Sequence, residues 1–441
     1  MKEKRFRERP PRSPLEKDDP VKDRLLKEQV LRHFWAQRCF VQPELDVRFR
    51  GGISPDPKMI TDVDIFVLRP HPDLYFERIL ADCRTLKGQS PIGRVLWLRG
   101  VMDFAGARTG LVLLGANARI EQDHKLAANR IGIRLLRDEE FPAYDKAIVY
   151  PEGSERVAIS LRDIQAFKDL ARRFPKLERL LTYLYRDAWA EATFGELFRH
   201  LIGQMRTVAS ELDPEKVDHV ALVCDAAAIF AVGLAECAGE VFHQYLQPSQ
   251  KEILSESLKL LVWGGHEQYH FYQSLRKRAL EAQSGGRKTE ASPLDLPEWD
   301  QLIQLVRSLL DRPGAAFDVP WLLRRLAIDT MRRSEPLRYV RRSDLVALKF
   351  SMLTVMYLTK ASGLPREFSK QLEDVLVKVQ ARLALGAGTG PREVDAPKEG
   401  QGYQPRAGSM PDGTAESSGP GPTQTVFPDV LESRTGPRPE G

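Results

Sequence analysis

Short apolar runs and stretches of helical spacing alternate along residues 21–150. Residues 21–38 carry Leu31, Phe34 and Trp35 on one side of a predicted helix. Further helices are expected at residues 90–104 and 116–128. Runs typical of strands lie at residues 39–49, 60–68, 76–84, 109–115 and 131–138. This order predicts an α/β domain in which a mixed sheet is flanked by helices, ending near residue 150.

Beyond residue 160 the pattern has helical spacing alone, so residues 151–385 are expected to form an all-helical domain. Helices are predicted at residues 161–174, 177–190, 194–210, 217–246, 253–263, 266–282, 299–310, 319–333, 343–361 and 368–385. A polar, glycine-containing connection at residues 285–297 divides this region. The basic segment 1–20 and the Gly-, Pro- and Ser-rich tail 386–441 are expected to be disordered, because they bury too little apolar surface.

The composition favours a globular protein of more than one domain. Of its 441 residues, 42% are hydrophobic and 29% are charged, and the net charge of +5 permits a polyanionic partner without requiring one. Four scattered cysteines without CxxC spacing predict reduced thiols. No apolar run approaches the roughly 20 uncharged residues of a membrane span, the nearest being residues 345–358. With no secretory signal, we expect a cytoplasmic protein that does not enter a membrane. A homo-oligomer remains open.

Acidic residues mark the ends of two predicted strands. Asp64 falls late in one strand, and Asp82 and Arg84 fall late in the next, on a common face because they are two residues apart. Glu28 is expected on the inward side of the first helix, where an unpaired carboxylate is costly. Carboxylates that converge at strand ends hold hard cations such as Mg²⁺ or Mn²⁺. Such a cation offers a route to phosphodiester hydrolysis.

At these residues the chain resembles the PD-(D/E)XK nucleases, in particular the branch similar to Mrr and Holliday-junction resolvases. The matching pieces, over roughly residues 21–140, are Glu28, Cys39-Phe40, Val63-Asp64-Ile65 and Asp82-Cys83-Arg84. The resemblance implies a restriction-endonuclease-like fold and metal-dependent cleavage of DNA in defence or repair. Glu28, Asp64 and Asp82 would then hold the metal, while Arg84 would stabilise the transition state.

Two departures from the family pattern keep a second interpretation open. Asp82 replaces the usual glutamate, and Arg84 replaces a lysine that can give up its proton. Arg84 can stabilise charge on a phosphate but cannot act as a general base. The alternative is therefore a catalytically inactive nuclease-fold protein that binds nucleic acid or acts as a scaffold. In either case Arg94 and Arg99, on the helix after the second strand, are expected to contact phosphates.

A separate motif, His266-Glu267-Gln268-Tyr269-His270, matches the HExxH pattern of zinc hydrolases. On a helix His266 and His270 share a face and can bind Zn²⁺, with Glu267 as general base. The competing interpretation is a structural role within the helices. An arginine-rich stretch at residues 321–342 also has two interpretations, a nucleic-acid channel or an ordinary basic helix face.

Overall fold

The computed structural model describes residues 21–49, 58–85, 90–148, 159–248, 250–283, 294–338 and 340–386. The two segments expected to be disordered, residues 1–20 and the tail beyond residue 386, lie outside these ranges. The described residues belong to one compact unit that comprises both the α/β part and the helical part.

The strands of the described residues form one mixed sheet in the order β1-β2-β3-β4-β5. The first three strands pair antiparallel, and β3, β4 and β5 pair parallel. This confirms the predicted mixed sheet. The strands are β1 Phe40–Phe49, β2 Lys58–His71, β3 Tyr75–Arg84, β4 Thr109–Leu114 and β5 Ile133–Arg137.

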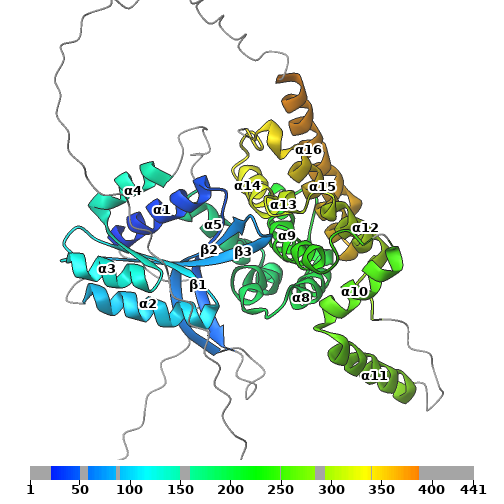
Figure 1. The fold of residues 1–441 in the computed structure, drawn as a ribbon. Helices are drawn as coiled ribbons and strands as arrows, with labels where there is room; N and C mark the ends of the chain where they lie inside the picture. The colour runs from blue at the N-terminus through cyan, green and yellow to red at the C-terminus, as the bar shows by residue number, and fades with distance from the viewer. Residues whose placement is uncertain are drawn as a thin grey trace, which may run out of the picture. The chain divides into compact units, whose positions relative to one another are not determined.

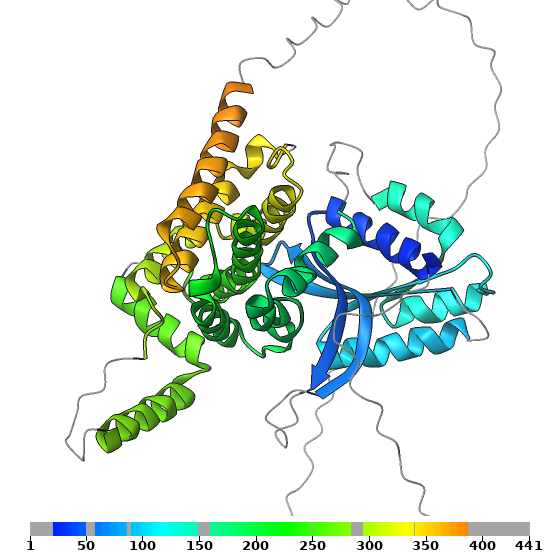
Figure 2. The ribbon, with the colours of Figure 1, turned by 180° about the vertical axis from the view of Figure 1, so that it is seen from behind.

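Helices cover both faces of this sheet. Figures 1 and 2 show α1 and α4 on one side and α2 and α3 on the other. The predicted start of α3 at residue 116 is wrong, because Glu121 caps the helix and shares a capping box with His124. The helix at 141–148 was not predicted. These helices are α1 Val21–Ala36, α2 Pro91–Ala105, α3 Gln122–Arg130 and α4 Phe141–Ile148.

The remaining described residues are helical, as predicted. The predicted helix 161–174 divides at Asp169, and the predicted helix 177–190 continues after α7 as a π-helical turn, Tyr183–Asp187, and a 3₁₀ turn, Ala188–Ala190. The other helices are α5 Leu161–Lys168, α6 Leu170–Arg173, α7 Glu178–Thr182, α8 Phe194–Thr207, α9 Val217–Tyr245, α10 Lys251–Trp263, α11 His266–Gln283, α12 Trp299–Leu310, α13 Pro313–Ala316, α14 Val319–Met331, α15 Leu345–Ala361 and α16 Arg366–Gly386.

Helix α9 is the central element of the helical part. In the described residues it alone is long and apolar enough to cross a membrane, and most of its length is buried among the other helices (Figure 1). Among the described residues, the segment closest to a membrane span is therefore α9, and not residues 345–358 as the sequence analysis expects. Its C-terminal half contacts the β2–β3 hairpin, where a Cβ on Gly239 would lie 2.2 Å from the carbonyl oxygen of Leu74. Gly239 is thus required for this close approach.

A fully buried ion pair joins the helices to the edge strand β1. Arg324 on α14 places its Nε 2.6 Å from Oδ1 of Asp225 on α9. The same guanidinium donates to the carbonyl of Val41 at 3.2 Å and to the side chain of Gln42 at 3.1 Å. Tyr185 donates its hydroxyl to Asp225 at 2.5 Å. Arg324 therefore links its own helix, α14, to helix α9 and to strand β1.

The arginine-rich stretch 321–342 is buried in its first part only, and its other arginines are exposed, so a nucleic-acid channel there stays a prediction. Trp321, Arg324 and Arg325 are all buried. Trp321 donates its indole N–H to the carbonyl of Trp35 at the end of α1, at 3.1 Å. These side chains pack between the two parts of the protein, so they are not available to a polyanion.

We expect Arg324→Met to lower the free energy of unfolding by about 3–5 kcal/mol, because Asp225 is left buried without its cation. Arg307→Met on α12 is the matched control, since Arg307 is exposed, and should change stability by less than about 0.5 kcal/mol. Urea unfolding followed by circular dichroism measures both values. The double variant Arg324→Met/Asp225→Leu should recover much of the loss. Equal stability of Arg324→Met and the parent would contradict this role.

Candidate functional site

Three of the predicted site residues meet at one end of the sheet. Ile65 pairs with Ala81, so Asp64 lies beside Asp82 on the neighbouring strand. Arg84 follows on the same face, with Nε 3.4 Å from Asp82 and a terminal nitrogen 3.8 Å from Asp64. Two carboxylates from different strands therefore share one guanidinium.

The fourth predicted residue, Glu28, is not part of this group. Its carboxylate pairs with Arg32 one helical turn further along α1, at 2.7 Å. Lys27 takes the inward position instead, and its ammonium lies 3.1 Å from Oδ1 of Asp64. The reason is helical phase, since Lys27 is aligned with the buried Leu31 and Phe34 at intervals of four and three residues. The prediction that Glu28 faces inward is wrong, because the neighbouring residue Lys27 has that position.

The two predicted phosphate contacts lie in different surroundings. Arg94 on α2 donates two hydrogen bonds to Asp82, one of them from Nε at 3.0 Å, and stacks on the Trp97 ring. Arg99 pairs instead with Asp103 on its own helix and donates to the carbonyl of Ile131. Arg94 thus belongs to the site as a partner of Asp82, whereas Arg99 does not reach it.

We call Lys27, Asp64, Asp82, Arg84 and Arg94 the Asp64–Asp82 cluster. Burial raises the pKa of Asp64, and Lys27, Arg84 and the backbone N–H of Cys83 oppose that rise. Burial alone would lower the pKa of Arg84, but the two carboxylates raise it above its ordinary value. The cluster holds three cations and two anions, and its neighbours Glu44, Asp62 and Lys168 bring the count to four of each sign, so the charges of the site are balanced.

A divalent cation does not fit this arrangement. The Oδ1 atom of Asp64 faces Lys27 and Arg84, and its Oδ2 accepts from the N–H of Cys83 at 2.7 Å. Both oxygens of Asp82 accept from Arg94. Across the described residues, no group of three or more His, Cys, Asp or Glu side chains is placed to hold a metal.

Two further contacts extend the site, and the sequence reasoning missed both. Glu44 on β1 lies 3.9 Å from Lys27 and 3.4 Å from Lys168 of α5, so alternating charges continue to the helical part. Asp23 at the start of α1 accepts hydrogen bonds from the backbone and hydroxyl of Thr85, just after β3. The helical spacing of Lys27 from the buried Leu31 and Phe34 could have predicted that Lys27 faces inward. The sequence around Glu44 contains no pattern that predicts its contacts with Lys27 and Lys168.

The HExxH motif forms a histidine pair on an exposed helix. His266 and His270 place their Nε2 atoms 3.0 Å apart on α11, none of whose side chains is buried. Within the described ranges no third ligand joins them. The zinc hydrolase therefore stays a prediction, for which His266 and His270 are the two candidate zinc ligands.

No protein-family model, curated protein or solved structure matches this chain.

We expect Lys27→Met to lower the free energy of unfolding by about 3 kcal/mol near neutral pH, because the buried Asp64 loses its nearest cation. The pKa of Asp64 should rise further in the variant. Its folded-state pKa then exceeds its unfolded value, so the penalty is present above the folded pKa and is relieved as pH falls through it.

The measurement is the difference in unfolding free energy between parent and variant from about pH 8 down to about pH 5. That difference should narrow toward the acidic end. Lys349→Met, an exposed lysine on α15, should show little change at any pH. A difference that stays constant across this range would show that Lys27 does not interact with the charge of Asp64.

Proposed function

We propose that the α/β part is a restriction-endonuclease-like module that binds the phosphate backbone of nucleic acid, DNA in the first place, without hydrolysing it. The observation that carries this proposal is the charge balance of the Asp64–Asp82 cluster, in which every carboxylate oxygen already faces a donor. The carboxylates therefore need no metal ion, and the exposed cation of the cluster, Arg84, is available to an anion.

Arg84 is the residue suited to contact a phosphate. Its side chain is 33% exposed, whereas that of Lys27 is 4% exposed and that of Arg94 is 17% exposed. A guanidinium presents parallel N–H donors that match two phosphate oxygens, and it stays protonated. Asp64 and Asp82 hold Arg84 at the end of β3, which limits the conformational entropy lost on binding.

Backbone contacts of this kind give affinity without reading sequence. They also make binding depend on salt, because each neutralised phosphate releases counterions. The module would therefore bind DNA of unrelated sequences with similar affinity, and the chain's net charge of +5 favours such an encounter.

Metal-dependent hydrolysis is the second candidate, and one observation favours it. Asp64 and Asp82 do converge from adjacent strands, in the order that the nuclease resemblance implies. Against it, the cluster would have to release Lys27 and Arg94 from these carboxylates before a cation could bind. Arg84 also cannot serve as a general base.

A plasmid assay separates the two candidates. Supercoiled plasmid incubated with the full-length protein and Mg²⁺ or Mn²⁺ should remain uncut while still being retained on a gel. Cleavage that disappears in Asp64→Ala would establish the hydrolase and overturn the non-hydrolytic proposal. Cleavage equal in Asp64→Ala and the parent would point to a contaminating nuclease.

For DNA binding, we expect Arg84→Ala to weaken affinity about equally for unrelated sequences and to reduce the slope of log affinity against log salt by about 1. Arg84→Lys, which keeps the charge, should retain the slope. Fluorescence anisotropy with labelled duplexes over a salt series measures both. The matched control is Arg307→Ala, an exposed arginine on α12. If Arg84→Ala and Arg307→Ala behave alike, Arg84 does not contact the phosphate.

A further inference from the structure

A second basic surface lies on the connection between α14 and α15, outside the Asp64–Asp82 cluster. Residues 332–342 contain five arginines and one glutamate. All five arginines are exposed, and we call them the loop arginines: Arg332, Arg333, Arg338, Arg341 and Arg342. An exposed run of guanidinium groups is the kind of surface that attracts a polyanion.

Buried contacts fix the backbone that carries the loop arginines. The N–H of Leu337 donates to Oδ2 of the buried Asp329 at 2.9 Å, and the carbonyl of Leu337 accepts from Arg382 at 2.6 Å. The N–H of Arg341 donates to Oδ2 of the buried Asp344 at 2.8 Å. A backbone held in this way loses little conformational entropy when the surface binds a partner.

The carboxylates near the loop leave its surface basic. Asp163, whose side chain is 11% exposed, pairs with Arg332. Glu335 lies 3.7 Å from Arg338, and the side chain of Arg338 is 64% exposed. Asp344 is buried and accepts hydrogen bonds from both terminal nitrogens of Arg38. The loop therefore presents mainly guanidinium groups, which match the geometry of phosphate oxygens.

Helix α1 sets the distance between the loop and Arg84. At the start of α1, Asp23 accepts from the N–H of Thr85, the residue after Arg84. Just past the end of α1, Arg38 pairs with Asp344 of the loop. The helix has 16 residues, so at 1.5 Å per residue it is about 24 Å long. This length corresponds to about seven base pairs of B-DNA at 3.4 Å each.

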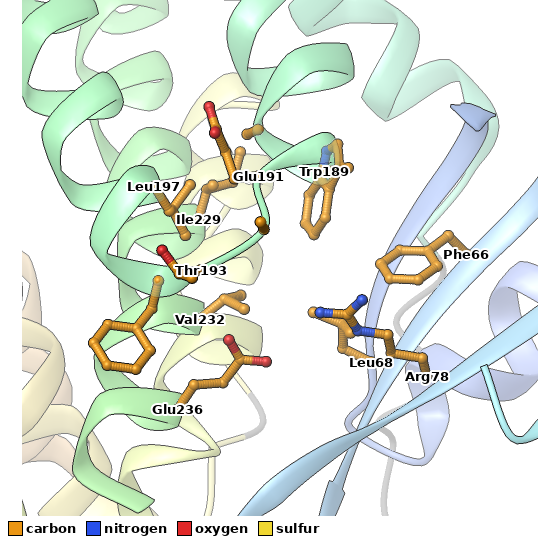
Figure 3. Close-up of a pocket in the computed structure, with 13 residues that line it drawn as sticks. Phe66, Leu68, Arg78, Trp189, Glu191, Thr193, Leu197, Ile229, Val232 and Glu236 are labelled. Carbon is orange, nitrogen blue, oxygen red and sulfur yellow. The ribbon is translucent and has the colours of Figure 1, made fainter. Parts of the chain in front are cut away.

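Contacts between the two parts of the protein keep this separation fixed. Trp35 of α1 and Trp321 of α14 lie with ring centroids 5.4 Å apart. Where β3 approaches α9, Arg78 faces Glu236 and their opposite charges attract, as Figure 3 shows. The loop and Arg84 therefore belong to one rigid surface.

The outer side of α1 carries basic residues between the two sites. Arg24 and Arg32 are eight residues apart, which places them on one side of the helix. Glu28 lies between them and pairs with Arg32 at 2.7 Å, and its side chain is 15% exposed against 54% for Arg32. A polyanion that lies along α1 therefore meets arginine at both ends and on the way.

We propose that the loop arginines and Arg84 bind one DNA duplex at the same time, with α1 lying between the two contacts. Phosphates about seven base pairs apart would occupy the two sites. This inference rests on the proposed function, because Arg84 supplies one of the contacts. It adds a second contact surface and a minimum length of duplex, since a shorter duplex reaches one site only.

The test removes charge at each site and varies the length of the DNA. The variants are Arg84→Ala, the triple variant Arg333→Gln/Arg338→Gln/Arg342→Gln, and their combination. Fluorescence anisotropy over a salt series gives the slope of log affinity against log salt for the full-length protein. With a duplex of about 20 base pairs, the slope should fall by about 1 in Arg84→Ala, by about 2–3 in the triple variant and by their sum in the combination.

A duplex of about 6 base pairs is too short to reach both sites. The loop arginines can bind it alone, so Arg84→Ala should leave its salt slope unchanged. If Arg84→Ala lowers the slope equally for both lengths, the two sites do not share one duplex.

A matched control removes the same charge elsewhere. The triple variant Arg278→Gln/Arg307→Gln/Arg312→Gln changes exposed arginines on α11, on α12 and just after α12, and it should keep the parental slope. Circular dichroism checks the fold of each variant. If the triple loop variant fails to fold, Arg338→Gln alone should lower the slope by about 1 with the longer duplex.

The outcomes separate this inference from the proposed function. If the loop variant and its control behave alike while Arg84→Ala lowers the slope, the loop contact is overturned and the contact of Arg84 stands. If the loop variant lowers the slope while Arg84→Ala does not, the contact of Arg84 is overturned, and the shared duplex with it.

Discussion

The ion pair between Arg324 and Asp225 is the constraint on which the arrangement of this protein depends. Both side chains are fully buried, and a buried charge without its partner costs several kcal/mol. The guanidinium also needs acceptors, which it finds on Val41 and Gln42 of β1. The helices can therefore satisfy Arg324 only when they lie against the sheet. The relation between the two parts is set by charge matching as well as by apolar packing.

The cost of burying a charge without a partner also determines the contacts of the Asp64–Asp82 cluster. Burial raises the pKa of Asp64, and two routes can keep its carboxylate ionised, a metal ion or protein cations. The structure uses protein cations, because Lys27 lies in contact with Asp64 and Arg94 in contact with Asp82.

The sequence predicts the sheet well, because strand alternation is local. The shared face of Asp82 and Arg84 follows from period-two geometry alone and is seen in their contact. Glu28 was misplaced because a helix turns 100° per residue, so an error of one position exchanges Glu28 for Lys27. The start of α3 depended on a cap at Glu121. Arg324 could not be assigned to the core, because its partner is 99 residues away in the chain.

The way in which the buried charges are compensated also determines which partner the cluster suits. Every carboxylate oxygen of Asp64 and Asp82 faces a donor within the protein, so neither side chain needs a metal ion. Arg84 lies against both carboxylates, and its side chain is 33% exposed, so the group that the cluster presents to solvent is a cation. A cation held in this way matches phosphate oxygens and does not distinguish between base sequences, which is why the proposed partner is a phosphate backbone.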